Sequence, residues 1–405
     1  MDNLCKRCRG GCDVCIPTLF VDFCHMVGKV QEVEITVKKI FIVFMVVIWL
    51  ATGCGDKVNV ENLSLSLLVG IDLDEENNLI FSASSPVFSE EAKMKEEDFT
   101  KPATTLRKSR DEDDKTFMAL TTGGKTQAIL IGKKVMQHEG WFKLLDPYMR
   151  DPKNTLNARI VMVDGPAYEV VQYKPTDKPR LPLYVLQLID TAARRNLTLK
   201  TSVQDLWRAA YEKGITASVS EVRKDDRLLV TGVALMDEEG KYKLSIGANE
   251  NRLLRILQNE TQGNFQFTFK SFDQPKGEIF PENAYSFSAE KISVKTKTHY
   301  AEDKFKFDVN VKIRIILTER LFPLDVRKEK GKLEKDIEEH LENQFGQLIA
   351  KIQEAQIDPV GFGLYARAFE YDHWKPVQDR WGQTFSKAEV KVKVKATIAA
   401  MGTTK

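Results

Sequence analysis

Two segments near the C-terminus alternate strictly between apolar and polar residues, and they constrain the fold more than any other feature. The apolar positions of the first are Phe305, Phe307, Val309, Val311, Ile313 and Ile315, and those of the second are Val390, Val392, Val394, Ala396 and Ile398. Such alternation predicts strands with one wet face. Between them an apolar stripe with helical spacing runs through Leu333, Ile337, Leu341, Phe345, Leu348 and Ile352. We therefore expect residues 283–402 to form an antiparallel sheet covered by a long helix.

The chain before this region alternates between strand and helix patterns. Apolar runs indicate strands at 63–71, 79–87, 127–132 and 158–163, and helical spacing follows at 135–145, 183–195 and 202–213, with Ser202 as a candidate N-cap. Strands at 228–236 and 243–246 and a helix at 249–260 come next, and a phase shift between Ala289 and Ile292 indicates a bulge. The polar stretch 90–115 predicts a solvated loop, with a calcium site as an alternative that lacks the EF-hand spacing.

These patterns predict an α+β protein with three mixed α/β domains. The Pro- and Gly-containing segment 271–281 is the best domain boundary. We expect an N-terminal α/β domain at 54–200, a small middle α/β domain at 201–272 and the C-terminal domain at 283–402.

An export signal is predicted upstream of these domains. Lys38 and Lys39 precede an apolar run of 12 residues, Ile40–Ala51, which is shorter than the roughly 20 residues that a membrane-spanning helix needs. The run leads into the lipobox-like residues Leu50, Ala51, Thr52 and Gly53, which are followed by Cys54. We expect residues 1–53, an upstream extension and signal peptide, to be removed and Cys54 to carry a diacylglyceryl group. An ordinary secretory signal is the alternative.

Composition and motif searches give little support for catalysis. Five of the six cysteines lie before this signal, so a chain that starts at Cys54 has no partner for a disulfide. The formal net charge of +2 is close to neutral and argues against nucleic-acid binding. The histidines are scattered without metal-ligand spacing, and Gly123-Gly124-Lys125-Thr126 lacks the first glycine of a phosphate-binding loop. We expect no enzyme activity, no metal and no cofactor apart from the covalent lipid.

Several short motifs occur in a characteristic order. They are Gly53-Cys54-x-Asp56-Lys57, Gly70-Ile71-Asp72, Ile129-Leu130-Ile131-Gly132, Leu144-Leu145-Asp146 with Arg150-Asp151, Thr231-Gly232-Val233-Ala234, Asp358-Pro359-Val360-Gly361-Phe362-Gly363, Trp374 and Trp381. In this order they resemble the Ger(x)C lipoproteins, the C subunits of nutrient germinant receptors in endospore-forming bacteria. Gly55 departs from the tryptophan usual in that family, and the segment before Ile129 lacks the family's histidine.

The resemblance implies a subunit anchored by lipid to the outer face of the spore inner membrane. Its partners would be an A subunit and a transporter-like B subunit, and the complex would respond to amino acids, sugars or nucleosides. The alternative is a solute-binding lipoprotein that feeds a transporter, and an envelope hydrolase is a third hypothesis. From the residues themselves, we expect Gly361 and Gly363 to form a backbone turn around Phe362 rather than a ligand contact. Trp374 and Trp381, seven residues apart, would lie on one helical face and pack in the core, with partner docking as the second interpretation.

Overall fold

A computed structural model describes most of the chain, namely residues 44–45, 62–89, 91–116, 119–271, 283–322 and 326–400. Residues Val60–Lys405 form one compact unit, separate from Met1–Asn59. The fold of the larger unit positions the turn, the groove and the pocket described below.

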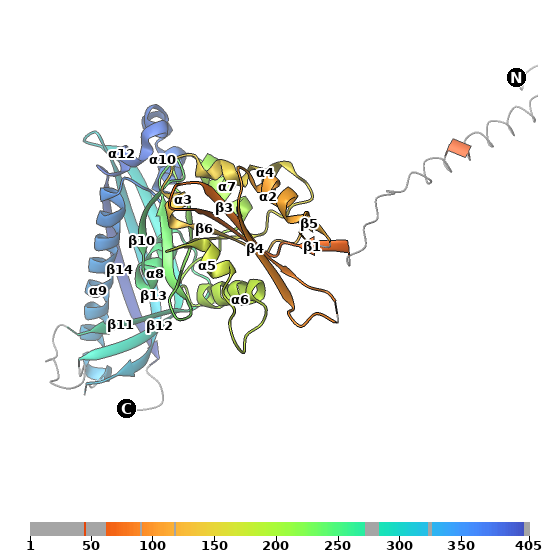
Figure 1. The fold of residues 1–405 in the computed structure, drawn as a ribbon. Coiled ribbons are helices and arrows are strands. Elements are labelled where there is room, and N and C mark those ends of the chain that lie inside the picture. Colours follow the sequence, from red (N-terminus) through yellow and green to blue (C-terminus); the bar gives the residue numbers. More distant parts are fainter. Residues whose placement is uncertain are drawn as a thin grey trace, which may run out of the picture. The chain divides into compact units, whose positions relative to one another are not determined.

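An eight-stranded sheet is formed by the N-terminal part of this unit (Figure 1). Its strands are β2 (Leu68–Leu73), β3 (Leu79–Pro86), β4 (Glu96–Pro102), β6 (Ala128–Gly132), β7 (Arg159–Val163), β8 (Ser218–Lys224), β9 (Leu228–Met236) and β10 (Tyr242–Ile246), in the order β10-β9-β8-β7-β6-β2-β3-β4. The central strands β2, β6, β7 and β8 are parallel, and antiparallel strands flank them on both sides. A small parallel pair joins β1 (Leu63–Leu65) to β5 (Leu120–Thr122).

Helices cover both faces of the large sheet. They are α2 (Leu106–Asp113), α3 (Lys133–Met136), η2 (Trp141–Leu145), α4 (Asp146–Arg150), α5 (Ala167–Val171), α6 (Leu181–Arg194) and α7 (Val203–Tyr211). Ile129 and Ile131 of β6 pack with α3, η2, α4 and α7, whereas Ala128 and Leu130 pack with α5 and α6. Because both faces of the parallel strands are covered, β6 is apolar throughout rather than alternating.

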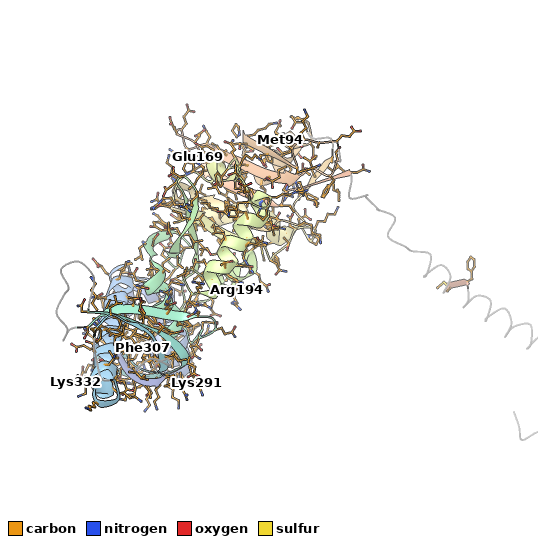
Figure 2. The ribbon with its side chains drawn as sticks, turned by 90° about the horizontal axis from the view of Figure 1, so that it is seen from below. Met94, Glu169, Arg194, Lys291, Phe307 and Lys332 are labelled. Atoms are coloured by element: carbon orange, nitrogen blue, oxygen red, sulfur yellow. The ribbon has the colours of Figure 1, made fainter. Side chains whose placement is uncertain are left out.

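The C-terminal layer is a four-stranded sheet with a long helix. Its strands are β11 (Phe265–Lys270), β12 (Ala284–Ala301), β13 (Lys304–Arg320) and β14 (Glu389–Ala400), and its helix is α9 (Val326–Glu354). In Figure 2 this layer is marked by Phe307 of β13, Lys291 of β12 and Lys332 of α9. Every residue of the predicted helical stripe is buried. The α+β class and the sheet packed on a long helix are therefore confirmed.

The pairing within this sheet differs from the prediction. β11, β12 and β13 are antiparallel neighbours, but β14 runs parallel to β13, from the pair Lys306 and Glu389 onward. The chain leaves the end of β13, returns through α9 and begins β14 beside the start of β13, which is a β-α-β crossover. An alternating pattern predicts which face is wet but contains nothing about strand direction, so the expectation of a purely antiparallel sheet was wrong.

The free edge of β14 is covered by carboxylates from α9. Three backbone N–H groups of β14 donate to three glutamates of α9: Val394 to Glu342 at 2.8 Å, Ala396 to Glu338 at 3.0 Å and Ile398 to Glu334 at 2.8 Å. The spacing matches because four helical residues rise about 6 Å and two strand residues rise about 6.6 Å. These contacts satisfy edge donors that would otherwise be open to pairing with another strand.

Residues 201–272 do not form a separate middle domain. Strands β8, β9 and β10 extend the large sheet next to β7, and β11 is the edge of the C-terminal sheet. Helix α8 (Ala248–Leu257) shares one apolar core with α9 and the C-terminal strands. The observed division therefore differs from the expected boundaries, because strands that are consecutive in sequence found partners in two different sheets.

The polar stretch 90–115 also differs from the prediction. It forms edge strand β4 and helix α2, whose N-cap Thr105 accepts a 3.1 Å hydrogen bond from the Lys108 backbone N–H. Asp113 at the end of α2 is fully buried, and neither carboxylate oxygen has a hydrogen-bond partner among the described residues. Burial raises the pKa of Asp113 to about 8. Apolar periodicity could not predict strand β4, because β4 is held by its pairing with β3 rather than by an apolar stripe of its own.

Local predictions elsewhere agree with the structure. Ser202 caps α7 in a capping box with Asp205. The register of β12 against β13 shifts between Ala289 and Lys291, where the bulge was predicted. Both features depend on residues within a few positions of each other, which is why sequence patterns reveal them.

Candidate functional site

One buried carboxylate organises the turn between α9 and α10 (Phe362–Phe369). The Oδ1 atom of Asp358 accepts a hydrogen bond from Gly361 N, and its Oδ2 atom accepts from Gly363 N and from Trp381 Nε1, all at 2.8 Å. Burial raises the pKa of Asp358 to about 6, and the N–H donors limit the rise because they favour the charged form. Asp358 thereby ties α10 to α12 (Trp381–Phe385).

The two motif glycines have different tasks in this turn. Gly361 has φ of +86°, a left-handed conformation that glycine adopts at little cost. Gly363 is needed for space, since a Cβ atom there would lie 2.4 Å from the Cα of Gly214 and 2.7 Å from Trp381 Nε1. The start of α10 therefore touches the backbone of the turn that follows α7.

The aromatic motif residues lie in the core. Phe362, Trp374 and Trp381 are all buried. Trp374 ends α11 (Tyr371–Trp374), and a 3-10 helix, η3 (Lys375–Arg380), separates it from Trp381 in α12. The expectation that both tryptophans occupy one helical face was wrong, because the chain turns between them.

A groove opens at the surface directly beside this turn. It has a volume of about 510 Å³, and we call it the α7–α10 groove; its lining includes Arg208, Ile215, Arg255, Val360, Leu364 and Phe369. Phe369 is 66% exposed. A second hollow that shares Arg208 is formed with Trp207 and Tyr211, and Tyr211 is 68% exposed. Exposed aromatic rings gathered at a groove are typical of interaction surfaces.

Arginines rim the α7–α10 groove. Arg208 lies 3.4 Å from Asp205, and Arg255 lies 3.6 Å from Glu260. Burial lowers the pKa of Arg255, which nonetheless stays charged at neutral pH. Each guanidinium carries five N–H donors, so one nearby carboxylate leaves several donors for a partner. Arginine beside aromatic rings is the composition most enriched at energetically important contacts.

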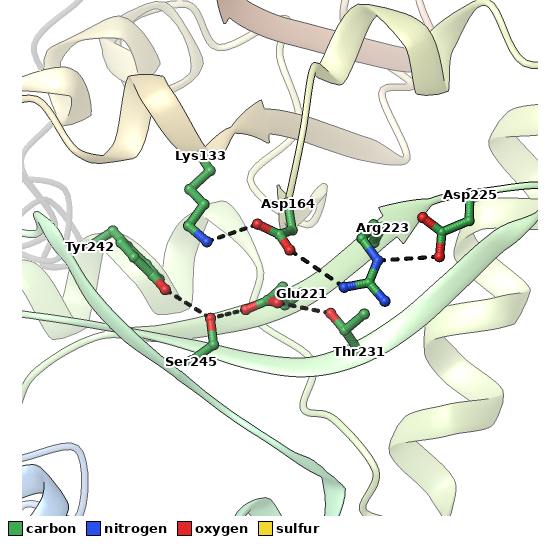
Figure 3. A network of polar contacts seen from close by, with 8 residues as sticks. All are labelled: Lys133, Asp164, Glu221, Arg223, Asp225, Thr231, Tyr242 and Ser245. Atoms are coloured by element: carbon green, nitrogen blue, oxygen red, sulfur yellow. Dashed lines mark hydrogen bonds and ion pairs between the residues drawn. The ribbon is translucent and has the colours of Figure 1, made fainter.

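The carboxyl ends of the parallel strands are the usual ligand site of an α/β sheet, but here they hold internal ion pairs. Lys133, after β6, lies 2.8 Å from Asp164, after β7, and Asp164 lies 3.8 Å from Arg223 of β8 (Figure 3). Buried Glu221 accepts hydrogen bonds from Thr231 at 2.9 Å and from Ser245. Both cations drawn in Figure 3 are therefore paired: Lys133 with Asp164, and Arg223 with Asp164 and Asp225. The Glu221 carboxylate is held by hydroxyl donors instead.

Asp72 completes this edge at the end of β2. Its carboxylate accepts hydrogen bonds from the backbone N–H groups of Leu73 and of Ala167, the first residue of α5. Burial raises the pKa of Asp72. Gly132 lies beside it, since a Cβ atom on Gly132 would be 2.4 Å from Asp72 Oδ1. The fold thereby brings the motifs that end in Asp72 and Gly132 together, although they are 60 residues apart. The Asp72 carboxylate lies at the start of α5, and in a nucleotide-binding sheet a phosphate would bind at such a helix start.

The remaining predictions concern the lipid anchor, a metal site and a membrane span. Leu50, Ala51, Thr52, Gly53 and Cys54 fall outside the described residues. Over the ranges that the structure describes, no cluster of three or more His, Cys, Asp or Glu side chains has the arrangement of a metal site. None of the helices described above contains an apolar stretch long enough to cross a bilayer.

Comparisons with known proteins decide the family. Residues 56–224 match the family model described as spore germination protein N-terminal domain, and residues 231–402 match the model described as spore germination B3/GerAC like, C-terminal. The chain belongs to the Ger(x)C family. This family comprises C-type subunits of spore germination receptors.

Individual relatives agree with this Ger(x)C assignment. Spore germination protein B3 of Bacillus subtilis (strain 168) is 24% identical over 397 residues, which cover 91% of this chain and 99% of that protein. Spore germination protein YndF of the same organism is 24% identical over 271 residues, or 65% of this chain and 64% of that protein. The crystal structure of the GerBC protein has the same fold, with a TM-score of 0.54 at 18% identity over 82% of this chain and 96% of that one.

Sequence reasoning missed the α7–α10 groove of this Ger(x)C protein and the second hollow that shares Arg208 with it. One signal was present: Trp207 and Tyr211 are four residues apart, as are Tyr365 and Phe369. In each pair the rings share one side of a helix, and they do not belong to the fully buried residues of α7 and α10. Aromatic pairs beside a buried stripe were therefore the available clue.

Proposed function

We propose that this protein is the lipid-anchored C subunit of a nutrient germinant receptor and that it acts by holding the receptor complex together. Its partners would be the A subunit and the transporter-like B subunit, on the outer face of the spore inner membrane. Membership of the Ger(x)C family supports the receptor role, and the lipobox-like sequence ending at Cys54 supports the anchor. The internally paired edge of the large sheet is consistent with a role in assembly rather than in binding a nucleotide.

The observation that carries the assembly role is the α7–α10 groove. Phe369, which lines the groove, is 66% exposed. Tyr211, in the second hollow that shares Arg208 with the groove, is 68% exposed. Burying one such side chain in an interface contributes about 1.5–3 kcal/mol, so the surface gains free energy when a partner covers it. The arginines at the rim add donors that orient carboxylates of the partner. The groove thus combines apolar and charged side chains, as protein interfaces do.

Substitution in the groove tests this role. Phe369→Asp replaces an apolar side chain of the lining with a charge, and we expect loss of co-purification with the membrane subunits and loss of germination with nutrients. Phe88→Asp is a matched control, because Phe88 is also exposed, at 49%, but lies in the connection after β3. Both variants are first compared with the wild type for protein level in spores. Normal assembly of the Phe369→Asp variant would contradict the assignment of this groove.

A second substitution tests the anchor. Cys54→Ala removes the thiol that would receive the diacylglyceryl group, and we expect the protein to leave the membrane fraction and nutrient germination to fail. Cys24→Ala is the control, because Cys24 lies within the segment expected to be removed. Mass spectrometry of the membrane form checks for the lipid. Germination of the Cys54→Ala spores at the wild-type rate would show that the anchor is dispensable.

Nutrient binding separates the assembly role from that of a solute-binding lipoprotein. Calorimetry of the purified full-length protein with amino acids, sugars and nucleosides is expected to show no saturable heat, because we assign nutrient recognition to the assembled receptor. Tight binding of one nutrient by this subunit alone would overturn the assembly role in favour of the alternative.

A further inference from the structure

A pocket distant in sequence from the α7–α10 groove lies between the tip of the β12–β13 hairpin and the segment from α11 to α12. It has a volume of about 280 Å³, and its lining includes Tyr300, Lys304, His373, Arg380, Thr384 and Lys387. We propose that this pocket binds a phosphate group. The inference is independent of the proposed assembly role.

Unpaired cations are the main argument. Lys304, Arg380 and Lys387 all line the pocket. Within the described ranges, none of these three side chains forms an ion pair with a carboxylate. Asp303 is the carboxylate in the lining, so positive charge dominates the pocket. Like charges around one hollow repel each other, and an anion between them relieves that repulsion.

Two acidic residues near the pocket form ion pairs with cations outside it. Asp379, next to Arg380, pairs with Lys213. Glu302, at the hairpin tip, lies 2.8 Å from Lys306. Asp379 and Glu302 thus form their ion pairs with lysines that do not line the pocket.

The frame of the pocket is well defined. Ala301 pairs with Lys304 across a two-residue turn in which Glu302 and Asp303 have φ of +53° and +57°. Two positive φ values are typical of the two-residue turn that matches the twist of a hairpin. This turn fixes the position of Lys304, the first residue of β13. The rings of Tyr300 and His373 stack with centroids 4.0 Å apart and join the hairpin to α11. The cations therefore project from two elements that are held against each other.

The residue types and the size indicate the ligand chemistry. An arginine fork binds two oxygens of a phosphate at once, and lysines supply point charges around it. The volume is just below the roughly 300–1,000 Å³ of pockets for drug-sized ligands, so it suits a phosphate with a small substituent rather than a nucleotide. Two sources present this group, a free phosphate ester and the head group of an anionic phospholipid.

Calorimetry on the full-length protein in a neutral detergent tests the proposal. The probes are inorganic phosphate and monomeric dihexanoyl phosphatidylglycerol, each compared with sodium chloride at equal ionic strength. We expect saturable binding that is about tenfold weaker or more in Arg380→Gln and in Lys387→Gln, the effect of one charge-assisted hydrogen bond. Lys375→Gln is the control, because Lys375 is exposed in the same segment but does not line the pocket.

Each result of this experiment has one meaning. Saturable binding of inorganic phosphate that depends on Arg380 identifies a site for free phosphate. Binding of the lipid probe alone, with the same dependence, identifies a head-group site. If neither probe saturates, or if Arg380→Gln and Lys387→Gln bind as the wild type does, the pocket is not a phosphate site.

Discussion

Replacing Glu338 with alanine is expected to release the outer edge of β14 from α9. The variant removes the carboxylate that accepts the backbone N–H of Ala396 at 3.0 Å and that lies 3.1 Å from Lys395. A hydrogen bond to a charged group contributes about 1.5–3 kcal/mol. The ion pair adds little, because the Lys395 side chain is 69% exposed. Alanine recovers a few tenths of a kcal/mol through its higher helix propensity, so the net loss is about 1–3 kcal/mol.

Hydrogen exchange measured by mass spectrometry can detect this loss where it occurs. If the free energy required to open the β14 edge falls by about 1.5–3 kcal/mol, the Ala396 amide is expected to exchange roughly 10- to 100-fold faster. Glu339→Ala is the matched control, because it makes the same chemical change one position along α9 at an exposed residue. We expect the peptide that covers β14 to exchange as in the wild type in this control.

The comparison of the two variants decides the matter. If Glu338→Ala and Glu339→Ala protect β14 equally well, the carboxylate does not stabilise the edge. In that case the matched spacing of helix and strand would have no energetic consequence.

Three further predictions rest on buried contacts. Gly363→Ala is expected to lower the free energy of unfolding by about 1–3 kcal/mol in urea titrations, because the new methyl group would meet the backbone of Gly214; an unchanged midpoint would refute the close approach. Trp381→Phe should lower the free energy of unfolding by about 1.5–3 kcal/mol more than Trp374→Phe does. The reason is that the Trp381 indole N–H donates to the buried Asp358 carboxylate, whereas the Trp374 indole N–H has no hydrogen-bond partner among the described residues. Asp113 has a folded pKa of about 8, above its unfolded value, so its contribution to stability is fully present below about pH 4 and is lost by about 1.4 kcal/mol per unit as the pH rises toward 8. The free energies of unfolding at pH 5 and at pH 7 should therefore differ less in Asp113→Asn than in the wild type. If the free energy of unfolding changes equally with pH in the variant and in the wild type, Asp113 ionises normally in the fold.

The candidate site was predictable only in part. The sequence contained the Asp358 to Gly363 motif, and the left-handed conformation of Gly361 follows from residue type. The role of Gly363 was not predictable, because it depends on contact with Gly214, which is 149 positions away. The contacts of Glu334, Glu338 and Glu342 with β14 were not predictable either. A glutamate beside an apolar stripe has the same sequence pattern whether its side chain faces water or an edge strand.

The sequence by itself determined the local elements of this protein: the alternating strands of the C-terminal layer, the apolar stripe of α9 and the cap of α7 at Ser202. It also determined the family, through the order of its short motifs. These features depend on residues a few positions apart and on which side of each element is apolar. The tertiary structure alone decided the parallel pairing of β14, the sharing of 201–272 between two sheets and the burial of Asp113. Those outcomes depend on contacts between segments far apart in the chain, and a local pattern contains no information about which distant segment will cover it.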